Sequence, residues 1–492
     1  MEDRTVTVEA MPRTGSARGH DGGSRPKPIQ RRPVAIDLFA GAGGLSVGLE
    51  QAGFDVVASV EYDPIHAAVH AYNFPRTTVL CADITRVSAD TIRDAVRCGI
   101  EAHGQDLGEW DGRVDLVAGG PPCQGFSTIG KRLLDDTRNR LVFEFYRVVK
   151  ELRPRYFLME NVPGMLAGGH KSAILDRLIE EFRAIGYSVV EPPRILKAAE
   201  YGVPQDRRRL VVLGAAEGLA LPAYPRPRVR PLAKNATTRP ISQEPWASAL
   251  PVGPSVLDAI GDLPDVDDFA SLAQSDETVL LPAQIAAMDK ATSDYAARLR
   301  GREVDPDDYS HPRLWDPSRL TSSMRTVHTE LSVRRFGATK PGEIEPVSRF
   351  YRLTADGLCN TIRAGTGSEH GAYTSPRPIH PTRPRVLTVR EAARLHSFPD
   401  WFRLHRTKWH GFRQVGNAVP PLLARAVGAE IVRSLGIEPT QPTEVISMGD
   451  PALLTMVMSA AREHFDADAA GIPARRTRPT SPNSLPIWGP NG

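Results

Sequence analysis

The chain has 492 residues, and its 61 lysines and arginines against 58 aspartates and glutamates give a formal net charge of +3 at pH 7. Hydrophobic residues make up 41% and charged residues 24%, which excludes a wholly disordered or fibrous chain and favours two or three domains. Arginines account for 52 of the basic residues, and arginine is the better side chain for paired contacts to phosphates and bases. A net charge of +3 does not by itself indicate a nucleic-acid-binding protein.

Cysteine usage and hydropathy predict the compartment. The four cysteines are Cys81, Cys98, Cys123 and Cys359; they lack the spacing of a zinc site and are too few for a disulfide framework. The first 30 residues contain no apolar segment typical of a signal peptide, and no long apolar run follows. We therefore expect a cytoplasmic protein with no bound metal and no membrane contact.

The two ends differ from the middle in composition. Residues 1–32 are rich in Gly, Arg, Ser and Pro without hydrophobic periodicity, which predicts a flexible N-terminal tail. The C-terminal extension, 437–492, is rich in Pro, Thr and Ser, and a short helical pattern over 451–465 interrupts it. That pattern either caps the core or binds a partner, and the first interpretation is favoured.

Short apolar runs alternate with helical patterns through the first half of the chain. The runs predict strands over 34–39, 54–60, 79–80, 114–118, 156–159 and 210–213. Helices are predicted over 45–51, from Pro64 onward and over 141–152. This alternation predicts an α/β fold with a parallel sheet and right-handed crossovers.

The regular alternation ends near Gly214. Residues 216–385 contain many prolines and glycines, which predicts a separate, loop-rich domain that begins with an acid-free, arginine-rich arm over 222–239. Helical patterns return over 388–396 and from Pro421 to Leu435.

Polar residues stand where the first three predicted strands end. Phe39-Ala-Gly41-Ala-Gly43-Gly44 follows the first strand, and glycines let backbone N–H groups approach a ligand. Glu61 ends the second strand, where it could bind ribose hydroxyls, and Asp83 ends the third, where it could accept a bond from an adenine amine. An adenosine-type ligand is the favoured interpretation; the alternative is a tight turn with helix-capping acids.

Two further strand ends carry candidate catalytic groups. Cys123 follows Gly119-Gly-Pro-Pro122, whose prolines would hold the thiol rigidly as a nucleophile, although a lone cysteine is more often a small buried hydrophobe. Glu160 ends the 156–159 strand; in a mostly apolar crevice its pKa would rise and it could donate a proton, and the alternative is a helix-capping acid.

An arginine cluster precedes the last strand of this half. In Gln205-Asp-Arg207-Arg208-Arg209, strand alternation would place Arg207 and Arg209 on one face of the sheet. The default interpretation of such a run is a solvated charge cluster.

Taken in order, these motifs resemble those of the DNA cytosine-C5 methyltransferases over roughly residues 34–436. The matching segments are Asp37–Gly44, Pro121–Ser127, Asp136–Leu141, Glu160–Val162, Gln205–Arg209, Arg390–Arg394 and Gly416–Pro420. His396 stands at a position that is often Gln in the family.

The resemblance implies a Rossmann-like, S-adenosylmethionine-dependent methyltransferase sheet with a second, smaller, loop-rich domain for DNA target recognition. It divides the chain into a tail (1–32), a catalytic domain (33–215 and 386–436), a target-recognition domain (216–385) and the C-terminal extension. It implies cofactor contacts, with S-adenosylhomocysteine as product, from Phe39, Gly41, Gly43, Gly44, Leu45, Glu61, Tyr62, Asp83, Ile84, Pro121, Leu141, Asn417, Ala418 and Val419.

The resemblance also implies a mechanism. The Cys123 thiolate adds to C6 of a cytosine rotated out of duplex DNA, Glu160 bonds N3, and Arg209 holds O2. Arg207 supports the site and lowers the pKa of the thiol, and no metal takes part. The implied DNA contacts are Gln124, Ser127, Thr361, Ile362 and Arg363.

The expected partner is double-stranded DNA, with a cognate restriction endonuclease or defence-system component as a functional partner of a monomeric prokaryotic enzyme. Two alternatives remain open at this point. One is an RNA cytosine-C5 methyltransferase on the same scaffold, and the other is a catalytically inactive DNA-binding relative.

Overall fold

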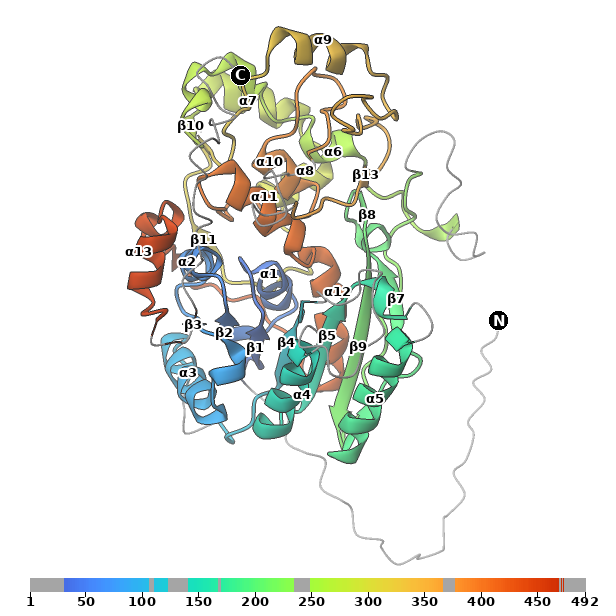
Figure 1. Ribbon diagram of the computed structural model, residues 1–492, viewed down its shortest axis with the longest axis vertical. Coiled ribbons are helices and arrows are strands. Elements are labelled where there is room, and N and C mark those ends of the chain that lie inside the picture. The colour runs from blue at the N-terminus through green and yellow to red at the C-terminus, as the bar shows by residue number, and fades with distance from the viewer. Residues whose placement is uncertain are drawn as a thin grey trace, which may run out of the picture.

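The computed structural model describes residues 31–105, 110–122, 140–166, 170–233, 248–365, 377–468, 470 and 472. Within these ranges no helix is both long and apolar enough to cross a membrane. The lower half of the molecule is an α/β unit, and a lobe of short helices and loops stands above it (Figure 1).

The α/β unit is built on an eight-stranded sheet with the order β3-β2-β1-β4-β5-β9-β6, in which β7 also pairs with β9. The strands are β1 (Val34–Leu38), β2 (Asp55–Glu61), β3 (Thr78–Cys81), β4 (Leu116–Gly119), β5 (Tyr156–Asn161), β6 (Tyr187–Val189), β7 (Arg194–Lys197) and β9 (Arg208–Ala216). All six predicted strands are present, and β6 and β7 are additional.

The prediction of a parallel sheet is wrong at one end. Strands β1 to β5 pair in parallel, but β9 runs antiparallel to β5, β6 and β7. A parallel neighbour needs a crossover of a dozen or more residues, usually through a helix. Only ten residues separate β7 from β9, and they hold no α-helix, so the chain reverses direction and the sheet is mixed.

Helices cover both faces of the sheet. Helices α3 (Ala89–Ala102), α4 (Arg140–Leu152) and α5 (His170–Ala184) contribute to one core cluster, to which Val34, Ile36 and Leu38 point. The intervening Ala35 points to the other cluster, with α1 (Gly44–Gln51) and α12 (Pro421–Ser434). Helix α1 ends at Gln51 and α12 begins at Pro421, 370 residues later, yet the two helices cover the same face.

Helix α12 lies unusually close to α1 because α1 contains Gly48. A Cβ atom at Gly48 would meet the Ala424 Cβ and the Pro421 carbonyl oxygen at 2.4 Å. Because α12 packs against α1, the residues just before α12, Asn417–Val419, lie beside the turn that follows β1.

The lobe above the sheet, residues 248–365 and 377–385, is called the upper lobe below. It contains α6 (Val256–Ile260), α7 (Pro282–Ala291), α8 (Asp294–Leu299), α9 (Glu330–Ala338) and strands of two residues, in agreement with the loop-rich prediction. Helices α10 (Val389–Arg394) and α11 (Lys408–Asn417) lie between this lobe and the sheet (Figure 1). Part of the lobe reaches down to the sheet half, where Arg313 pairs with Glu50 at 2.5 Å.

The chain ends depart partly from expectation. Residues 1–30 of the predicted tail lie outside the described residues, but Arg31 and Arg32 are held by Asp115 and Asp55 at 2.8 and 2.7 Å, so the tail prediction is wrong for these two. In the C-terminal extension, the turn Pro451–Leu454 buries two leucines in the core cluster that includes α2 (Pro64–Asn73). This confirms the capping interpretation, and α13 (Met458–His464) follows.

The α1–α12 contact generates a stability prediction. Replacing Gly48 by alanine forces the two helices apart, and overpacking of this kind costs about 1–3 kcal/mol of unfolding free energy. The matched control is Gly164→Ala, whose added Cβ would meet nothing within 4 Å. Urea unfolding followed by circular dichroism checks the prediction, which equal midpoints for the two variants would contradict.

Candidate functional site

A cavity of about 1080 Å³ lies at the ends of the central strands. It is bordered by the ends of β1, β2, β3, β4 and β5, the start of β9, the turn between α11 and α12, and α13. Ligands of open α/β sheets bind at this edge. All but one of the predicted cofactor residues line it: Phe39, Gly41, Gly44, Leu45, Glu61, Tyr62, Asp83, Ile84, Pro121, Leu141, Asn417, Ala418 and Val419.

The exception, Gly43, lies in the same turn but packs against the Phe74 ring instead of lining the cavity. Its φ of 107° is a conformation that favours glycine, and a Cβ there would meet the Phe74 ring at 2.3 Å. At Gly44 a Cβ would meet the Val419 carbonyl oxygen at 2.6 Å. Gly44 therefore lets the turn lie directly against Val419. Segments from the first and the last part of the catalytic fold thus contribute to one wall of the cavity.

The two acids at the strand ends serve the fold and the cavity together. Glu61 accepts hydrogen bonds from the backbone N–H groups of Gly41 and Asp63, both at 2.7 Å. Asp83 Oδ1 accepts from the Thr85 backbone N–H at 3.0 Å and from its hydroxyl at 2.9 Å. Asp83 thus caps the short 3-10 turn Ile84–Arg86, as the capping alternative predicted. Both Glu61 and Asp83 also line the cavity.

A third acid, Asp37, points into the same cavity from β1. Its side chain is buried and accepts a hydrogen bond from the Ser46 hydroxyl at 2.7 Å, while its other oxygen has no partner among the described residues. Burial raises the pKa of Asp37 from 3.8 to about 7, partly opposed by Ser46. A buried carboxylate with one oxygen that lacks a hydrogen-bond partner in the described part of the chain suits a cationic ligand.

Glu160 and Arg209 form an ion pair on the floor of the cavity. The Arg209 Nε lies 2.6 Å from Glu160 Oε1, and both side chains line the cavity. Because β9 is antiparallel to β5, the start of β9 lies beside the end of β5, which brings these two side chains together. The surroundings of Glu160 are therefore less apolar than predicted, because a charged guanidinium lies beside it. The helix-capping alternative concerns the helix after Gly168, and residues 167–169 lie outside the described residues.

Asn161 connects this pair to the segment that carries the predicted nucleophile. Its Nδ2 donates to the Pro121 carbonyl oxygen at 3.2 Å, and Pro121 and Pro122 line the cavity. Cys123, Gln124 and Ser127 lie outside the described residues.

Arg207 lies away from the cavity lining, in the junction between the sheet and the upper lobe. Its guanidinium is buried and donates to three backbone carbonyl oxygens, those of Ile362 and Gly416 at 3.0 Å and of Ala418 at 2.8 Å. Arg207 follows the two-residue strand β8 (Gln205–Asp206) and directly precedes β9, and the exposed Arg208 separates it from Arg209, in keeping with the predicted alternation. Arg207 is nevertheless buried in the junction, whereas Arg209 reaches the cavity.

The predicted DNA-reading residues after β13 (Cys359–Asn360) have different surroundings. The Thr361 hydroxyl donates to the Asp206 carbonyl oxygen at 2.5 Å. Ile362 is buried, and its N–H donates to Gln205 Oε1 at 3.1 Å. Arg363 is exposed. Of the three, the Arg363 side chain is the one open to solvent.

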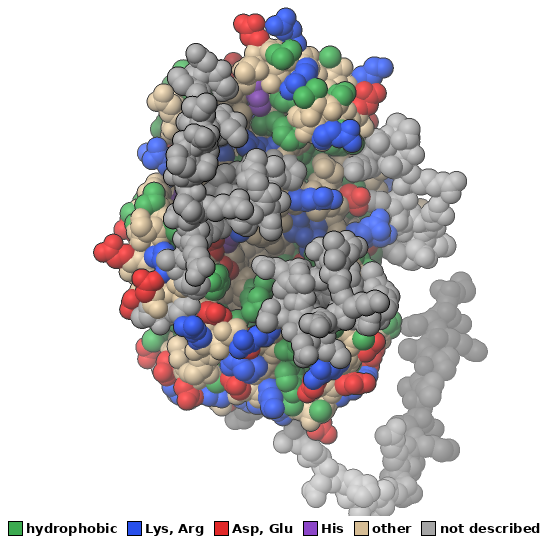
Figure 2. Space-filling model, in the orientation of Figure 1, with side chains coloured by type: hydrophobic (Ala, Val, Ile, Leu, Met, Phe, Trp, Pro, Cys, Tyr) green, Lys and Arg blue, Asp and Glu red, His purple; other side chains and the backbone are tan. Residues whose placement is uncertain are grey.

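Figure 2 shows a hollow where the sheet half meets the upper lobe, and Lys and Arg side chains gather on the part of its wall drawn in colour. Arg208 and Arg363 are exposed arginines, from β9 and from the segment after β13. Such a basic wall suits a polyanionic ligand.

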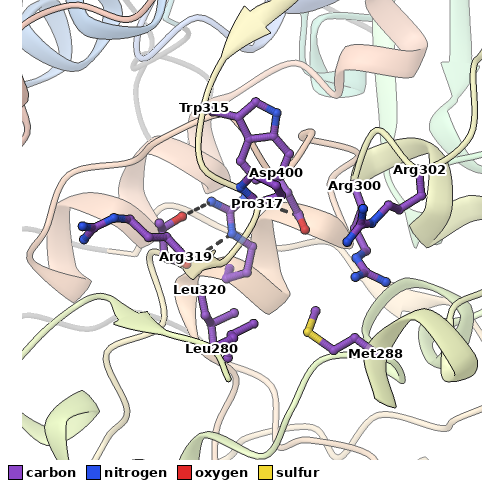
Figure 3. A pocket seen from close by; sticks show the side chains of 11 residues that line it. Leu280, Met288, Arg300, Arg302, Trp315, Pro317, Arg319, Leu320 and Asp400 are labelled. Carbon is purple, nitrogen blue, oxygen red and sulfur yellow. Dashed lines mark hydrogen bonds and ion pairs between the residues drawn. The ribbon is translucent and has the colours of Figure 1, made fainter. Parts of the chain in front are cut away.

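A second cavity, of about 20 Å³, lies in the upper lobe (Figure 3). Its volume is about that of one water probe. Arg300 and Arg302 both pair with Asp289, at 2.6 and 3.3 Å, and Arg319 pairs with Glu277 at 2.8 Å. With these charges matched, the cavity belongs to the packing of the lobe.

Sequence reasoning missed several cavity-lining residues: His66, Arg413, Gln414, Met458, Arg462 and Ile472. Arg413 and Gln414 stand three and two residues before the Gly416–Pro420 motif, so extending that motif by three residues would have found them. Met458, Arg462 and Ile472 follow the last motif, and no sequence signal places them here.

The chain belongs to the C-5 cytosine-specific DNA methylases, whose family model matches residues 34–433. Its activity is the methylation of C5 of cytosine in DNA, and its sheet is the α/β methyltransferase sheet expected for that class.

Among particular proteins, the chain is 51% identical over 448 residues to the type II methyltransferase M.XorII of Xanthomonas oryzae pv. oryzae, covering 91% of this chain and 96% of that protein. It is 33% identical to the type II methyltransferase M.AgeI of Thalassovita gelatinovora, covering 80% and 98%. A solved structure of a putative DNA modification methyltransferase encoded within an E. coli prophage matches with a TM-score of 0.60 and 31% identity, covering 82% of this chain and all of that one.

The buried guanidinium generates a second prediction. Arg207→Lys keeps the charge but cannot reach three carbonyl oxygens, so we expect unfolding free energy to fall by about 3 kcal/mol. The matched control is Arg208→Lys at the exposed neighbour. Thermal unfolding of both variants checks this, and an equal melting temperature would show that the carbonyl contacts contribute little.

The buried Asp37 generates a pH prediction. Its pKa is higher in the folded chain than in the unfolded one, so its cost to stability is absent below about pH 4 and complete above about pH 7. Asp37→Asn removes that cost, and we expect a gain of roughly 2–4 kcal/mol at pH 8 and a smaller gain at pH 5. Urea unfolding of the ligand-free protein at the two pH values measures the difference; a pH-independent effect would refute it.

Proposed function

We propose that the protein transfers a methyl group from S-adenosylmethionine to C5 of a cytosine rotated out of duplex DNA, through a covalent bond between Cys123 and C6. One observation carries the proposal: a single cavity includes the glycine turn with Glu61 and Asp83, and also the Glu160–Arg209 pair. A donor and an acceptor of a methyl group must meet in one enclosure.

The donor half of the cavity fits the cofactor. About 1080 Å³ exceeds the ~300–1,000 Å³ typical of one drug-sized ligand, which leaves room for a base beside the nucleoside. Glu61 would bind the ribose hydroxyls, and Asp83 would accept a hydrogen bond from the adenine amine. The oxygen of Asp37 that has no partner among the described residues would face a positively charged group of the cofactor. When bound, the cofactor supplies an electrophilic methyl group on a sulfonium.

The acceptor half suits the activation of a cytosine ring. C5 becomes nucleophilic when the Cys123 thiolate adds to C6, and the negative charge that develops on the ring needs a proton or a donor at N3. We assign Glu160, in its protonated form, to give that proton, and Arg209 to fix the Glu160 carboxyl and to donate toward O2. After methyl transfer, a base removes the C5 proton, the C6–sulfur bond breaks with its electron pair leaving on sulfur, and the N3 proton returns to Glu160, which restores the thiolate and the acid.

The assignment of Cys123 follows from the chain that leads to it. Pro122 lines the cavity and directly precedes Cys123 in the sequence, and Asn161 fixes Pro121 beside Glu160. Prolines restrict the backbone on the approach to the thiol.

The upper lobe is proposed to recognise the DNA target. A base inside a stacked duplex is reached by rotating it out, at a cost of roughly a few kcal/mol. A lobe opposite the sheet, with basic residues on the wall between, can hold the duplex while the base enters. We assign Gln124, Ser127, Thr361 and Arg363 to DNA contacts, with the Ile362 side chain supporting them from the core.

The biological setting is proposed from the relatives. Two of them are named type II methyltransferases, which supports a modification enzyme that protects DNA in a restriction–modification system together with a cognate endonuclease. A monomeric, cytoplasmic enzyme remains our proposal from the sequence.

The decisive experiment is expression in a methylation-free bacterial host with mapping of 5-methylcytosine in both DNA and RNA. We expect methylation at one short DNA sequence with the wild type, and none with Cys123→Ala, because the ring is then not activated. The matched control is Cys98→Ala, which removes an exposed thiol and should leave methylation intact. Purified Cys123→Ala should still bind S-adenosylhomocysteine; methylation by this variant, or methylation of RNA alone, would refute the proposal.

A further inference from the structure

The C-terminal extension does more than cap the core. The family model ends at residue 433, yet three residues beyond it, Met458, Arg462 and Ile472, line the large cavity together with Tyr62 and Asp83. A segment outside the family match therefore supplies part of the wall.

The extension is fixed to the sheet half at successive points along its length. The Gly449 N–H donates to the Tyr72 carbonyl oxygen at 2.9 Å, and a Cβ at Gly449 would meet Tyr72 Cα at 2.9 Å. Leu453 and Leu454 are buried in the same core cluster as Tyr72. The extension is therefore fixed to α2 and its core cluster before the chain reaches the cavity at Met458.

The last described part of the extension folds over the edge strand β3. Ala467 and Ile472 are buried with Ala67 of α2 and Cys81 of β3. In Figure 1, α13 lies at the side of the molecule next to α2 and β3. This is the edge at which Tyr62 and Asp83 follow β2 and β3.

Arg462 holds this part in shape. Its Nη2 donates to the Ile472 carbonyl oxygen at 2.7 Å and also bonds the Asp468 carboxylate. The guanidinium thus closes the turn after α13 while one side of it faces the cavity. Its charge is close enough to Tyr62 to act on the phenol: burial and Asp83 raise the Tyr62 pKa, and Arg462 opposes them.

We propose that Met458, Arg462 and Ile472 form an additional wall of the cofactor site, in which Met458 and Ile472 contact the adenosine end of the cofactor. Arg462 is a positioning residue that holds this wall against Tyr62. The inference rests on the proposed function, because it takes S-adenosylmethionine as the ligand of the cavity. Apolar atoms beside a purine remove both surfaces from water, which favours binding.

The test measures binding rather than turnover. Calorimetric titration of the full chain with S-adenosylhomocysteine, in the absence of DNA, should give a Kd about tenfold higher for Met458→Ala than for wild type. Arg462→Ala should weaken binding similarly, and Arg462→Lys should restore part of the loss. The matched controls are Ser459→Ala and Glu463→Ala, exposed positions on the same helix, with expected Kd values within twofold of wild type.

A second ligand locates the contact within the cofactor. Methylthioadenosine carries the adenosine end without the amino acid, so its Kd should rise by the same factor in Met458→Ala. Thermal unfolding of each variant tests for folding, and Met458→Ala is the safer probe because no side-chain hydrogen bond is lost.

The outcomes separate the two proposals. If the wild type binds S-adenosylhomocysteine and the Met458→Ala and Arg462→Ala variants bind it equally well, the wall proposal is overturned and the proposed function stands. If the wild type does not bind it, the proposed cofactor fails and the wall proposal fails with it.

Discussion

One buried guanidinium joins the parts of this enzyme that must act together. Arg207 follows the short strand β8 and donates to carbonyl oxygens of the segment after β13 and of the turn between α11 and α12. Its Nε has no partner among the described residues, so the buried charge depends on the three carbonyl oxygens that its Nη1 and Nη2 groups reach. The upper lobe and the cofactor wall must therefore both be in place around Arg207, and neither can shift alone. The contacts of this guanidinium are thus structural, and its predicted effect on the Cys123 thiol stays a prediction, because Cys123 lies outside the described residues.

The antiparallel end of the sheet has a direct chemical consequence. In an all-parallel sheet, the start of the strand carrying Arg209 would lie at the opposite edge from Glu160. The reversal of β9 brings the two side chains within 2.6 Å. The departure from the predicted topology is thus what assembles the Glu160–Arg209 ion pair.

Sequence reasoning reached the strands and the strand-end residues because each depends on local pattern: an apolar run followed by a glycine or an acid. The direction of β9 could not be predicted, because the apolar run over 210–213 is the same for a parallel and an antiparallel strand. The burial of Arg207 could not be predicted either, because its partners are backbone carbonyl oxygens, which every residue type carries. Arg462 was missed for a related reason: a contact between the chain's last quarter and its first is set by tertiary packing.

The order of synthesis has a consequence here. Helix α12 covers the same face of the sheet as α1, and residues 417–419 close the wall beside the glycine turn. A ribosome must therefore translate through residues 417–419 before the wall beside the glycine turn exists. A product that terminates before Asn417 lacks both this wall and the helix that covers α1.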